Sequence, residues 1–309
     1  MTASPAAAMT AGAGRFAPSP SGDLHVGNLR TAVLAWLFAR SSGRGFLLRV
    51  EDLDPERSRT EAAQLRDLTA VGLSWDAVPV RQSERTGYYL AAIDRLSEAG
   101  RVYECFCTRS EIADAPRAPH APPGAYPGTC RNLTEEERAR RRRDRPAALR
   151  LRADAEQYTV KDLLHGTFTG PVDDMVLLRN DGVPPYNLAV VIDDAAQGID
   201  QVVRGGDLLT SAPRQAYLAS LLGLPEVVYA HVPLVLNGAG QRLAKRDGAI
   251  TLTALAGIGM DSDDVRNLIL ASLNLPPGTL ENALDAFSPA LLPRGPWVFD
   301  SPGSALPGL

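Results

Sequence analysis

Three features are scarce in this sequence, and each scarcity excludes a class of protein. The 3 cysteines among 309 residues are too few for a disulfide framework, so we expect the protein to work in the reducing cytoplasm. No apolar run reaches membrane-spanning length, and the first residues, MTASPAAAMTAG, lack the basic start and apolar centre of a signal peptide. Basic residues (32) do not outnumber acidic ones (36), and the net charge of −4 argues against indiscriminate coating of nucleic acid, though not against a local basic face.

The remaining composition is typical of a soluble globular protein, with 45% hydrophobic and 22% charged residues. Residues 14–43 begin as a strand, break at Pro18 and Pro20, and continue from Leu29 as an apolar helical pattern that ends near Gly43. Further strands and helices alternate after this unit. The alternation predicts an α/β fold with a parallel, doubly wound sheet.

The α/β pattern is interrupted in the middle of the chain. From Val102 the sequence becomes rich in proline and loses its periodicity, and strands and helices return near Tyr186. Because chains tolerate insertions at surface loops, we expect an inserted module here. The expected parts are a disordered tail at 1–13, two halves of one main domain at 14–104 and 181–240, the module at 105–180, and a loop followed by short helices at 241–309.

The turn before the first long helix is the first candidate site. His25 and Gly27 stand at the helix entrance, where free backbone N–H groups and the positive end of the helix dipole suit a phosphate. Together with Arg15, Ser19 and Glu51, they fall at the carboxyl ends of the first two strands, the edge where open α/β sheets bind ligands. The alternative is an ordinary strand–helix turn that carries one surface histidine.

The second candidate site is the segment QRLAKRDGA, residues 241–249. It follows a predicted strand and holds Arg242, Lys245 and Arg246 within a short stretch. Closely spaced cations on a glycine-flanked loop suit a polyphosphate whose negative charge grows in a transition state. A solvated turn is the alternative.

Together, the two sites resemble those of the class I aminoacyl-tRNA synthetases. HVGN stands in the place of that family's HIGH signature and RLAKR in that of KMSKS, while RFAPSPSGDLHVGNLRTA and RVEDLDPERS are similar to the glutamyl branch. The resemblance implies a Rossmann-like catalytic domain in which His25, Gly27 and Lys245 are catalytic. It implies that ATP is bound by Pro18, His25, Gly27, Asn28, Arg242, Lys245 and Arg246. Asn28 departs mildly from the family, which has threonine or a similar residue there.

Glutamate has two carboxylates and one ammonium group, so its pocket needs cations and an anion together. Arginine suits a carboxylate because its planar fork binds both oxygens. Arg15 and Arg204 can supply the forks, Glu51 can supply the anion, and Tyr186 can supply a hydroxyl. Taken alone, Arg204 could also be a surface residue at a strand end. The resemblance places glutamate binding at Arg15, Phe16, Ala17, Pro18, Ser19, Glu51, Tyr186 and Arg204. Full-length members commonly have asparagine where this chain has Val190, which leaves room for a different hold on glutamate.

The cysteines suggest a zinc site in the expected module. Cys105 and Cys107 are followed by Cys130, and structural zinc takes four ligands. By chemistry alone His120 is the better fourth ligand, since imidazole is common at such sites. Tyr126 is the fourth ligand implied by a resemblance, because Cys-x-Cys…Tyr-x-x-x-Cys is similar to the glutamyl-queuosine tRNA(Asp) synthetases. Three free buried thiols are the alternative.

A basic run, Arg138 to Arg145, follows in the same module. It lies on a predicted helix that begins after Thr134, with Glu137 at the spacing of a capping box. Such a run is usually a solvated face. In the family that the chain resembles, however, the inserted module touches tRNA, which favours phosphate contact.

Length distinguishes two branches of the family. A full glutamyl-tRNA synthetase has a large helical anticodon-binding region after the KMSKS-like loop, whereas 63 residues follow Arg246 here, and we expect no such domain. The glutamyl-queuosine tRNA(Asp) synthetases, which are a catalytic core alone, resemble this chain in length and in VVRGGDLLTSAPRQ. The resemblance implies tRNA-independent activation of glutamate by ATP with Mg²⁺, and transfer of the glutamyl group to queuosine at the wobble position of tRNA(Asp).

Two alternatives to this function remain open at the level of sequence. The chain could be a truncated enzyme that charges the 3′ end of tRNA(Glu), or a paralogue without activity that binds tRNA. The expected partners are ATP, L-glutamate and queuosine-carrying tRNA(Asp), the expected resident metal is one structural Zn²⁺, and we expect a cytoplasmic monomer without a membrane partner.

Overall fold

A seven-stranded sheet forms the centre of the computed structural model, which describes residues 12–54, 56, 58–114, 126–243 and 250–299. The strand order is β3-β2-β1-β9-β10-β6-β7, and every pair is parallel except β6 with β7. The strands are β1 (Ala13–Phe16), β2 (Gly45–Val50), β3 (Val80–Arg81), β6 (Gln157–Asp162), β7 (Gly166–Pro171), β9 (Ile199–Gly205) and β10 (Val228–Val232).

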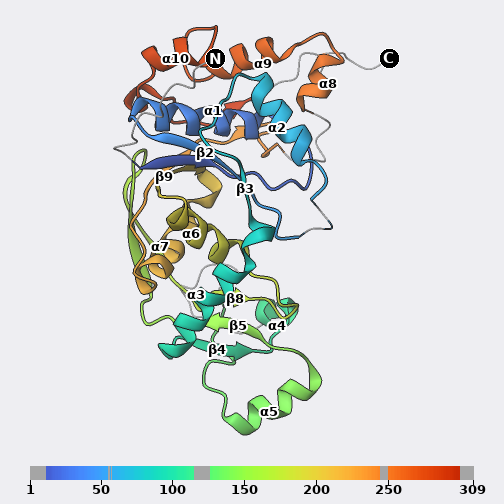
Figure 1. Cartoon of the computed structure of the whole chain (residues 1–309), viewed down its shortest axis with the longest axis vertical. Helices are drawn as coiled ribbons and strands as arrows, with labels where there is room; N and C mark the ends of the chain where they lie inside the picture. Colours follow the sequence, from blue (N-terminus) through green and yellow to red (C-terminus); the bar gives the residue numbers. More distant parts are fainter. Residues whose placement is uncertain (1–11, 55, 57, 115–125, 244–249, 300–309) are drawn as a thin grey trace, which may run out of the picture.

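Helices cover both faces of this sheet, which confirms the predicted doubly wound α/β fold (Figure 1). Helix α1 (Val26–Ser41) packs across β1, β2 and β9 on one face. On the other face, α6 (Tyr186–Ala196) contacts β9, and α7 (Ala212–Leu221) contacts β6 and β7. The carboxyl ends of the central strands therefore open at one edge of a well-covered sheet, where a ligand can bind.

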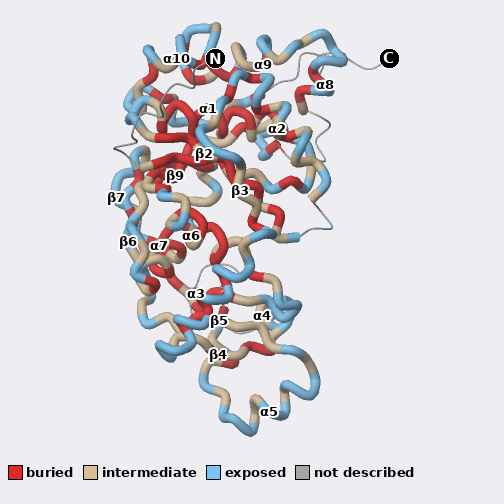
Figure 2. Tube along the Cα trace, in the orientation of Figure 1, coloured by how far each residue is buried: buried red, intermediate tan, exposed pale blue. Residues whose placement is uncertain are grey.

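Helix α1 is the best-buried helix of the fold, and its start is fixed by a capping box. His25 Nδ1 accepts a hydrogen bond from the Asn28 backbone N–H at 3.3 Å, and Asn28 Oδ1 accepts one from the His25 N–H at 3.2 Å. Most residues from Val26 to Ala39 are buried, which explains why the helix appears largely red in Figure 2. The packing around α1 thereby holds His25 at the edge of the sheet.

Short helices of the kind predicted for the end of the chain lie over α1 (Figure 1). Side chains from α8 (Leu252–Ala256), α9 (Ser262–Ala271) and α10 (Leu280–Ala286) share one hydrophobic cluster with α1. The further elements near the main sheet are α2 (Glu61–Ala70), η2 (Gln82–Arg85), η3 (Gly206–Ser211), β11 (Val235–Leu236), η4 (Pro289–Leu291) and β12 (Trp297–Val298). Among the described residues, no helix is long and apolar enough to cross a membrane.

A second, smaller sheet lies at the far end of the molecule (Figure 1). It consists of β4 (Val102–Cys105), β5 (Ala148–Leu151) and β8 (Val176–Leu178), all antiparallel. Helix α3 (Thr86–Glu98) precedes the small sheet in the chain, and α4 (Arg109–Asp114) and α5 (Glu135–Asp144) lie near that sheet.

The extent of this region differs from the expected module at 105–180. Strands β6 and β7, at 157–171, belong to the large sheet, since Asp162 pairs with Tyr229 of β10. The burial of β6 alternates along the strand, as expected for a strand near the edge that is covered on one face, here by α7. The small sheet thus begins at residue 102, whereas residues 157–171 of the interval up to 180 belong to the large sheet.

Candidate active site

A cavity of about 150 Å³ opens at the carboxyl edge of the large sheet. Side chains and backbone from the ends of β1, β2 and β9 line it, together with the starts of α1 and α6. Its lining includes these residues singled out from the sequence: Arg15, Phe16, Ala17, His25, Gly27, Asn28, Glu51, Tyr186, Arg204 and Arg242. The fold thus brings together segments that lie far apart in the chain.

Pro18 and Ser19 lie immediately beside this cavity and shape its rim. The Pro18 carbonyl accepts a hydrogen bond from the Glu51 N–H at 2.9 Å, and the Ser19 carbonyl accepts one from Gln64 Nε2 at 3.0 Å. Ser19 also lines a neighbouring hollow of about 270 Å³, which shares Glu51 and Tyr186 with the first cavity. The β1 end and the β2 end are therefore bound together at the rim.

Arg15 is buried and donates hydrogen bonds to Asp194, a residue that no motif in the sequence indicated. Its Nε and Nη2 donate to the two oxygens of Asp194 at 3.1 and 3.4 Å, and its Nη1 donates to the Val203 carbonyl at 3.5 Å. A guanidinium carries five N–H groups. Within the described part of the chain these contacts use three of them, so one N–H on each Nη can bind a ligand in the cavity.

Arg204 is buried in the same way at the end of β9. It donates from Nη1 to Gln215 Oε1 at 2.7 Å, from Nη2 to the Leu208 carbonyl at 3.3 Å, and from Nε to His231 Nε2 at 3.0 Å. Again one N–H group on each Nη is left. Two preset guanidinium groups, one from each half of the sheet, thus face one cavity.

A third buried arginine, Arg49, ties these elements together below the cavity. Its Nη1 donates to Asp194 Oδ1 at 2.7 Å, its Nη2 lies 3.6 Å from Glu51 Oε1, and its Nε lies 3.8 Å from Asp193 Oδ2. These three carboxylates raise the pKa of Arg49 above its usual value despite full burial. The signal in the sequence was the acidic pair of Asp193 and Asp194 inside an otherwise apolar helical pattern.

Glu51 stands out electrostatically within the cavity wall. Burial raises its pKa to about 7, and the neighbouring Arg49 and Arg15 only partly offset that effect. Asp194 behaves in the opposite way, because Arg15 and Arg49 outweigh its burial and hold its pKa below the ordinary range. Glu51 thus lines the cavity with its Oε1 as far as 3.6 Å from Arg49 Nη2, a position in which it can pair with a cationic ligand.

Helix α6 contributes Tyr186 and Val190 to different cavities. Tyr186 starts the helix and lines the first cavity, and burial raises the pKa of its hydroxyl, which keeps it neutral and able to donate. Val190 is buried one turn later and lines a larger cavity of about 600 Å³ on the other side, together with Asp194 and Gln215. Val190 therefore does not line the first cavity.

The helix entrance explains why glycine stands at position 27. A Cβ at Gly27 would lie 2.9 Å from Cε1 of His25, so a side chain there would displace the imidazole. Because His25 Nδ1 accepts from Asn28, the neutral ring carries its proton on Nε2 and can donate to a ligand oxygen. Arg242 reaches the same cavity and forms an ion pair with Asp207. Lys245 and Arg246 lie outside the described residues.

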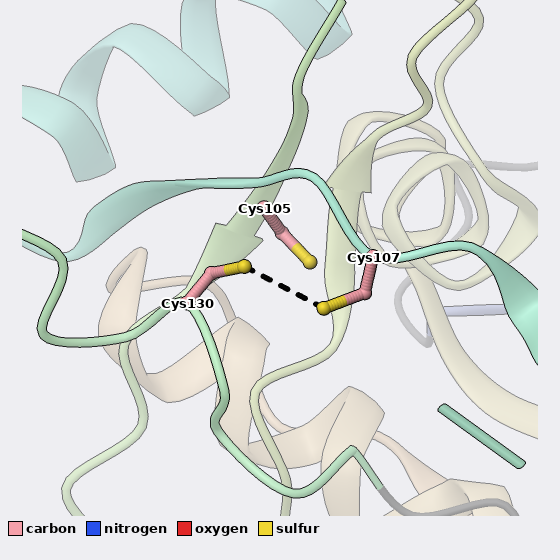
Figure 3. A group of neighbouring side chains, drawn as sticks. All are labelled: Cys105, Cys107 and Cys130. Atoms are coloured by element: carbon pink, nitrogen blue, oxygen red, sulfur yellow. Dashed lines mark hydrogen bonds between the residues drawn. The ribbon is translucent and has the colours of Figure 1, made fainter. Parts of the chain in front are cut away.

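The three cysteines gather at the end of β4, the strand that Cys105 closes, with their sulfur atoms pointing toward one another (Figure 3). The Sγ atoms of Cys107 and Cys130 are 3.5 Å apart, and all three lie within 4.8 Å of one another. The Tyr126 hydroxyl lies 3.3 Å from the Sγ of Cys105 and 3.7 Å from that of Cys107. His120 lies outside the described residues.

This arrangement fits a tetrahedral metal ion. Thiolates bound to zinc at about 2.3 Å are roughly 3.8 Å apart, close to the spacing of Cys107 and Cys130. The Tyr126 oxygen stands where a fourth ligand would be, and it accepts a hydrogen bond from the Cys130 N–H at 2.8 Å. The donor set and its spacing are therefore suited to zinc.

Comparison with known proteins identifies the family. Residues 13–284 match the family described as tRNA synthetases class I (E and Q), catalytic domain. The chain belongs to this family. It is 62% identical to the glutamyl-Q tRNA(Asp) synthetase of Nocardia farcinica over 297 residues, which cover 96% of each chain. It is 52% identical to that of Cutibacterium acnes over 271 residues, which cover 85% of this chain and 76% of that protein.

The solved structure of a glutamate tRNA ligase has the same fold. The glutamate tRNA ligase of Elizabethkingia meningosepticum, crystallised with its amino acid, superimposes with a TM-score of 0.78 at 26% identity. The match covers 93% of this chain and 66% of that one. The expected class I catalytic fold is therefore confirmed.

The basic run of this synthetase lies on α5, whose capping box is present as predicted. Thr134 Oγ1 accepts from the Glu137 N–H, and the Glu137 carboxylate accepts from the Thr134 N–H. No residue of this helix is buried. Part of its charge is matched locally, since Arg142 pairs with Glu104 and Glu135.

Proposed function

We propose that this protein activates glutamate with ATP, in the absence of tRNA, and then transfers the glutamyl group to the queuosine base at the wobble position of tRNA(Asp). One observation carries the proposal: a single cavity presents two arginine forks and one poorly satisfied carboxylate, complementary to the two carboxylates and the ammonium group of glutamate. The names of the relatives that share most of the chain, glutamyl-Q tRNA(Asp) synthetases, support the acceptor.

In this proposal the glutamate site has fixed charges before the substrate arrives. Arg204 and Arg15 each direct two unused N–H groups at a carboxylate, and Glu51 accepts from the substrate ammonium. Tyr186 donates its hydroxyl, while Phe16, Ala17, Pro18 and Ser19 form the wall. Because the arginines are already held by the protein, little reorganisation is needed on binding, and positioning is gained at low entropic cost.

ATP would bind at the entrance of α1, with Pro18, Gly27, Asn28, Arg242, Lys245 and Arg246 around it. The substrate α-carboxylate oxygen attacks the α-phosphorus in line, the new P–O bond forms, and the bond to pyrophosphate breaks. His25 Nε2–H donates to a phosphate oxygen, and Lys245 stabilises the charge that grows on the departing pyrophosphate. Mg²⁺ accompanying ATP would neutralise further phosphate charge.

The cysteine cluster is proposed to hold one structural Zn²⁺ through Cys105, Cys107, Cys130 and Tyr126. Bound zinc would supply a cross-link rather than catalysis, because all four positions are taken by the protein. The region it fastens carries the basic helix α5, which we propose faces tRNA phosphates. We further propose that the protein works as a monomer in the cytoplasm.

The activation step can be tested separately from the transfer step. Glutamate-dependent exchange of pyrophosphate into ATP, measured in a mixture free of tRNA, should proceed with glutamate and not with glutamine. Glutamine lacks the second carboxylate, so one buried fork would be left without its anion. Exchange that appears only when tRNA is added would contradict tRNA-independent activation.

A further inference from the structure

Arg204 is oriented by a histidine that no motif in the sequence singles out. The Arg204 Nε donates to His231 Nε2 at 3.0 Å, and His231 is completely buried in β10, beside β9. His231 does not line the cavity, so it does not touch a ligand there. Its contact with Arg204 fixes the direction in which the guanidinium plane faces the cavity.

The hydrogen bond also fixes the tautomer of His231. An arginine N–H can only donate, so His231 Nε2 must be an unprotonated acceptor and the ring proton must be on Nδ1. His231 Nδ1 lies 2.6 Å from Asp162 Oδ2, which accepts that proton's hydrogen bond. The chain Asp162–His231–Arg204 therefore has one consistent set of donors and acceptors.

Asp162 is itself held as a charged acceptor at the carboxyl end of β6. Its Oδ1 accepts from the backbone N–H groups of Leu164 and His165 at 2.8 and 2.9 Å, and its Oδ2 accepts from that of His231 at 3.1 Å. These donors and His231 keep the pKa of Asp162 well below its ordinary range despite burial. Asp162 is therefore ionised near neutral pH and remains the acceptor for the Nδ1–H of His231.

The groups that face His231 are Arg204, Asp162, His165 and Tyr229. The Tyr229 ring stacks on that of His231 with centroids 5.5 Å apart and also lies under the Arg204 guanidinium. His165 binds the other oxygen of Asp162, with its Nδ1 3.1 Å away. Burial lowers the pKa of His231, and Arg204 lowers it further, so these effects outweigh Asp162 and keep the ring neutral.

We infer that His231, locked in one tautomer by Asp162, is the positioning residue that aims Arg204 at a carboxylate of glutamate. The inference rests on the role proposed for Arg204. It also assigns a task to β6, because this strand of the intervening segment joins the large sheet beside β10 at the point where Asp162 meets His231. Selection of the amino acid thus depends on a strand that contributes no residue of its own to the glutamate cavity.

The test compares five variants by steady-state pyrophosphate exchange. His231→Leu removes the acceptor from Arg204 and should raise the KM for glutamate roughly tenfold to a hundredfold, the usual weight of a buried hydrogen bond to a charged group. The KM for ATP should stay within about twofold, since the ATP side is not touched. His231→Gln retains an acceptor oxygen and should recover most of the glutamate KM. His165→Leu, which removes a partner of Asp162 but none of Arg204, is the matched control and should behave as wild type.

Asp162→Asn keeps the test decisive if His231→Leu fails to fold. Asp162→Asn can donate to the ring and so permit the wrong tautomer, with an Nε2–H facing the Arg204 Nε–H. Its glutamate KM should rise in the folded protein even where its melting temperature stays close to that of His165→Leu. Equal glutamate KM values in Asp162→Asn, His231→Leu and the His165→Leu control would overturn the inference. Arg204→Ala, measured in parallel, separates the two proposals: a normal KM there means that Arg204 does not hold glutamate.

Discussion

The two ends of the molecule differ in how they keep polar groups in place. The large sheet is packed by extensive hydrophobic clusters, one of which also includes Leu151 and Leu177 of the small sheet. The buried Arg15, Arg49 and Arg204 are each matched by carboxylates or neutral acceptors. Around the cysteines, by contrast, the buried cluster consists of Tyr103, Cys105, Phe106, Tyr126 and Cys130 among the described residues, and α5 has no buried residue. Figure 2 shows the same contrast, with red concentrated near the large sheet.

The two ends therefore fix the positions of their polar side chains in different ways. A large core can hold charged groups out of water, where they act strongly on a substrate, because packing fixes them even before a ligand binds. The cluster at the cysteines buries less apolar surface, and the proposed zinc would add a cross-link there. Mutations should therefore affect ligand recognition at the first end and stability at the second.

The largest effect is expected from Arg204→Ala. Removing a fork that is already desolvated and oriented should raise the KM for glutamate by about 2–5 kcal/mol equivalent, roughly 30-fold to several thousand-fold. Arg204→Lys should rescue poorly, because the charge remains but the fork is lost. Pyrophosphate exchange measures both, and an unchanged glutamate KM would point to Arg15 as the recognising cation instead.

Lys245→Ala is the kinetic counterpart of that variant. The proposed role of Lys245 is confined to the transition state, so kcat should fall by about 10²–10³ while the KM for glutamate changes little. The same exchange assay separates the two parameters. A rise in glutamate KM without a fall in kcat would place Lys245 in substrate binding rather than in catalysis.

The second end should respond to loss of metal. The purified protein should contain about one zinc per chain, and Cys130→Ser should lose it and melt at a lower temperature. Exchange of pyrophosphate should survive, because the glutamate cavity has its own core, while transfer to tRNA should fall. Metal analysis of Tyr126→Phe and His120→Ala decides the fourth ligand: loss of zinc only in the second variant would rule out Tyr126.

A smaller effect is expected from pH, because the raised pKa of Glu51, about 7, lies in the physiological range. As the pH falls below 7 the carboxyl becomes protonated and no longer attracts the substrate ammonium, so the KM for glutamate should rise by up to about tenfold per pH unit. Above pH 7 the group is ionised and the KM should level off. Glu51→Gln should have a high KM that no longer depends on pH in this range, and a wild-type profile that is flat from pH 6 to 8 would contradict the role of Glu51.

The smallest effect is expected from the exposed arginines of α5. Replacing Arg140 and Arg143 with alanine should weaken transfer to tRNA a few-fold and reduce its salt dependence, by a slope of about one for each phosphate that is no longer neutralised. Pyrophosphate exchange should not change. Transfer with an unaltered salt dependence would assign this helix to a solvated face.

Much of the fold and part of the site could be predicted from the sequence. Periodicity predicted α1, and the position of Arg15, His25 and Glu51 at the carboxyl ends of the first two strands predicted that they lie at one edge, where they line one cavity. The acidic pair of Asp193 and Asp194 was a signal of buried charge, but which arginines it and His231 hold could not be predicted. Asp194 lies 179 residues from Arg15, and His231 lies 27 from Arg204, each within a mainly apolar segment that is typical of ordinary core. Such pairs arise from the register of neighbouring elements, which no local pattern encodes.

The most direct test of the central claim is transfer of labelled glutamate to tRNA(Asp) that carries queuosine, compared with the same tRNA lacking it, both with intact 3′ ends. The account predicts labelling of the queuosine-carrying tRNA alone, and its loss when periodate has first cleaved the cis-diol. Equal labelling of the tRNA without queuosine, or labelling of tRNA(Glu) at its 3′ end, would contradict it and favour a glutamyl-tRNA synthetase activity.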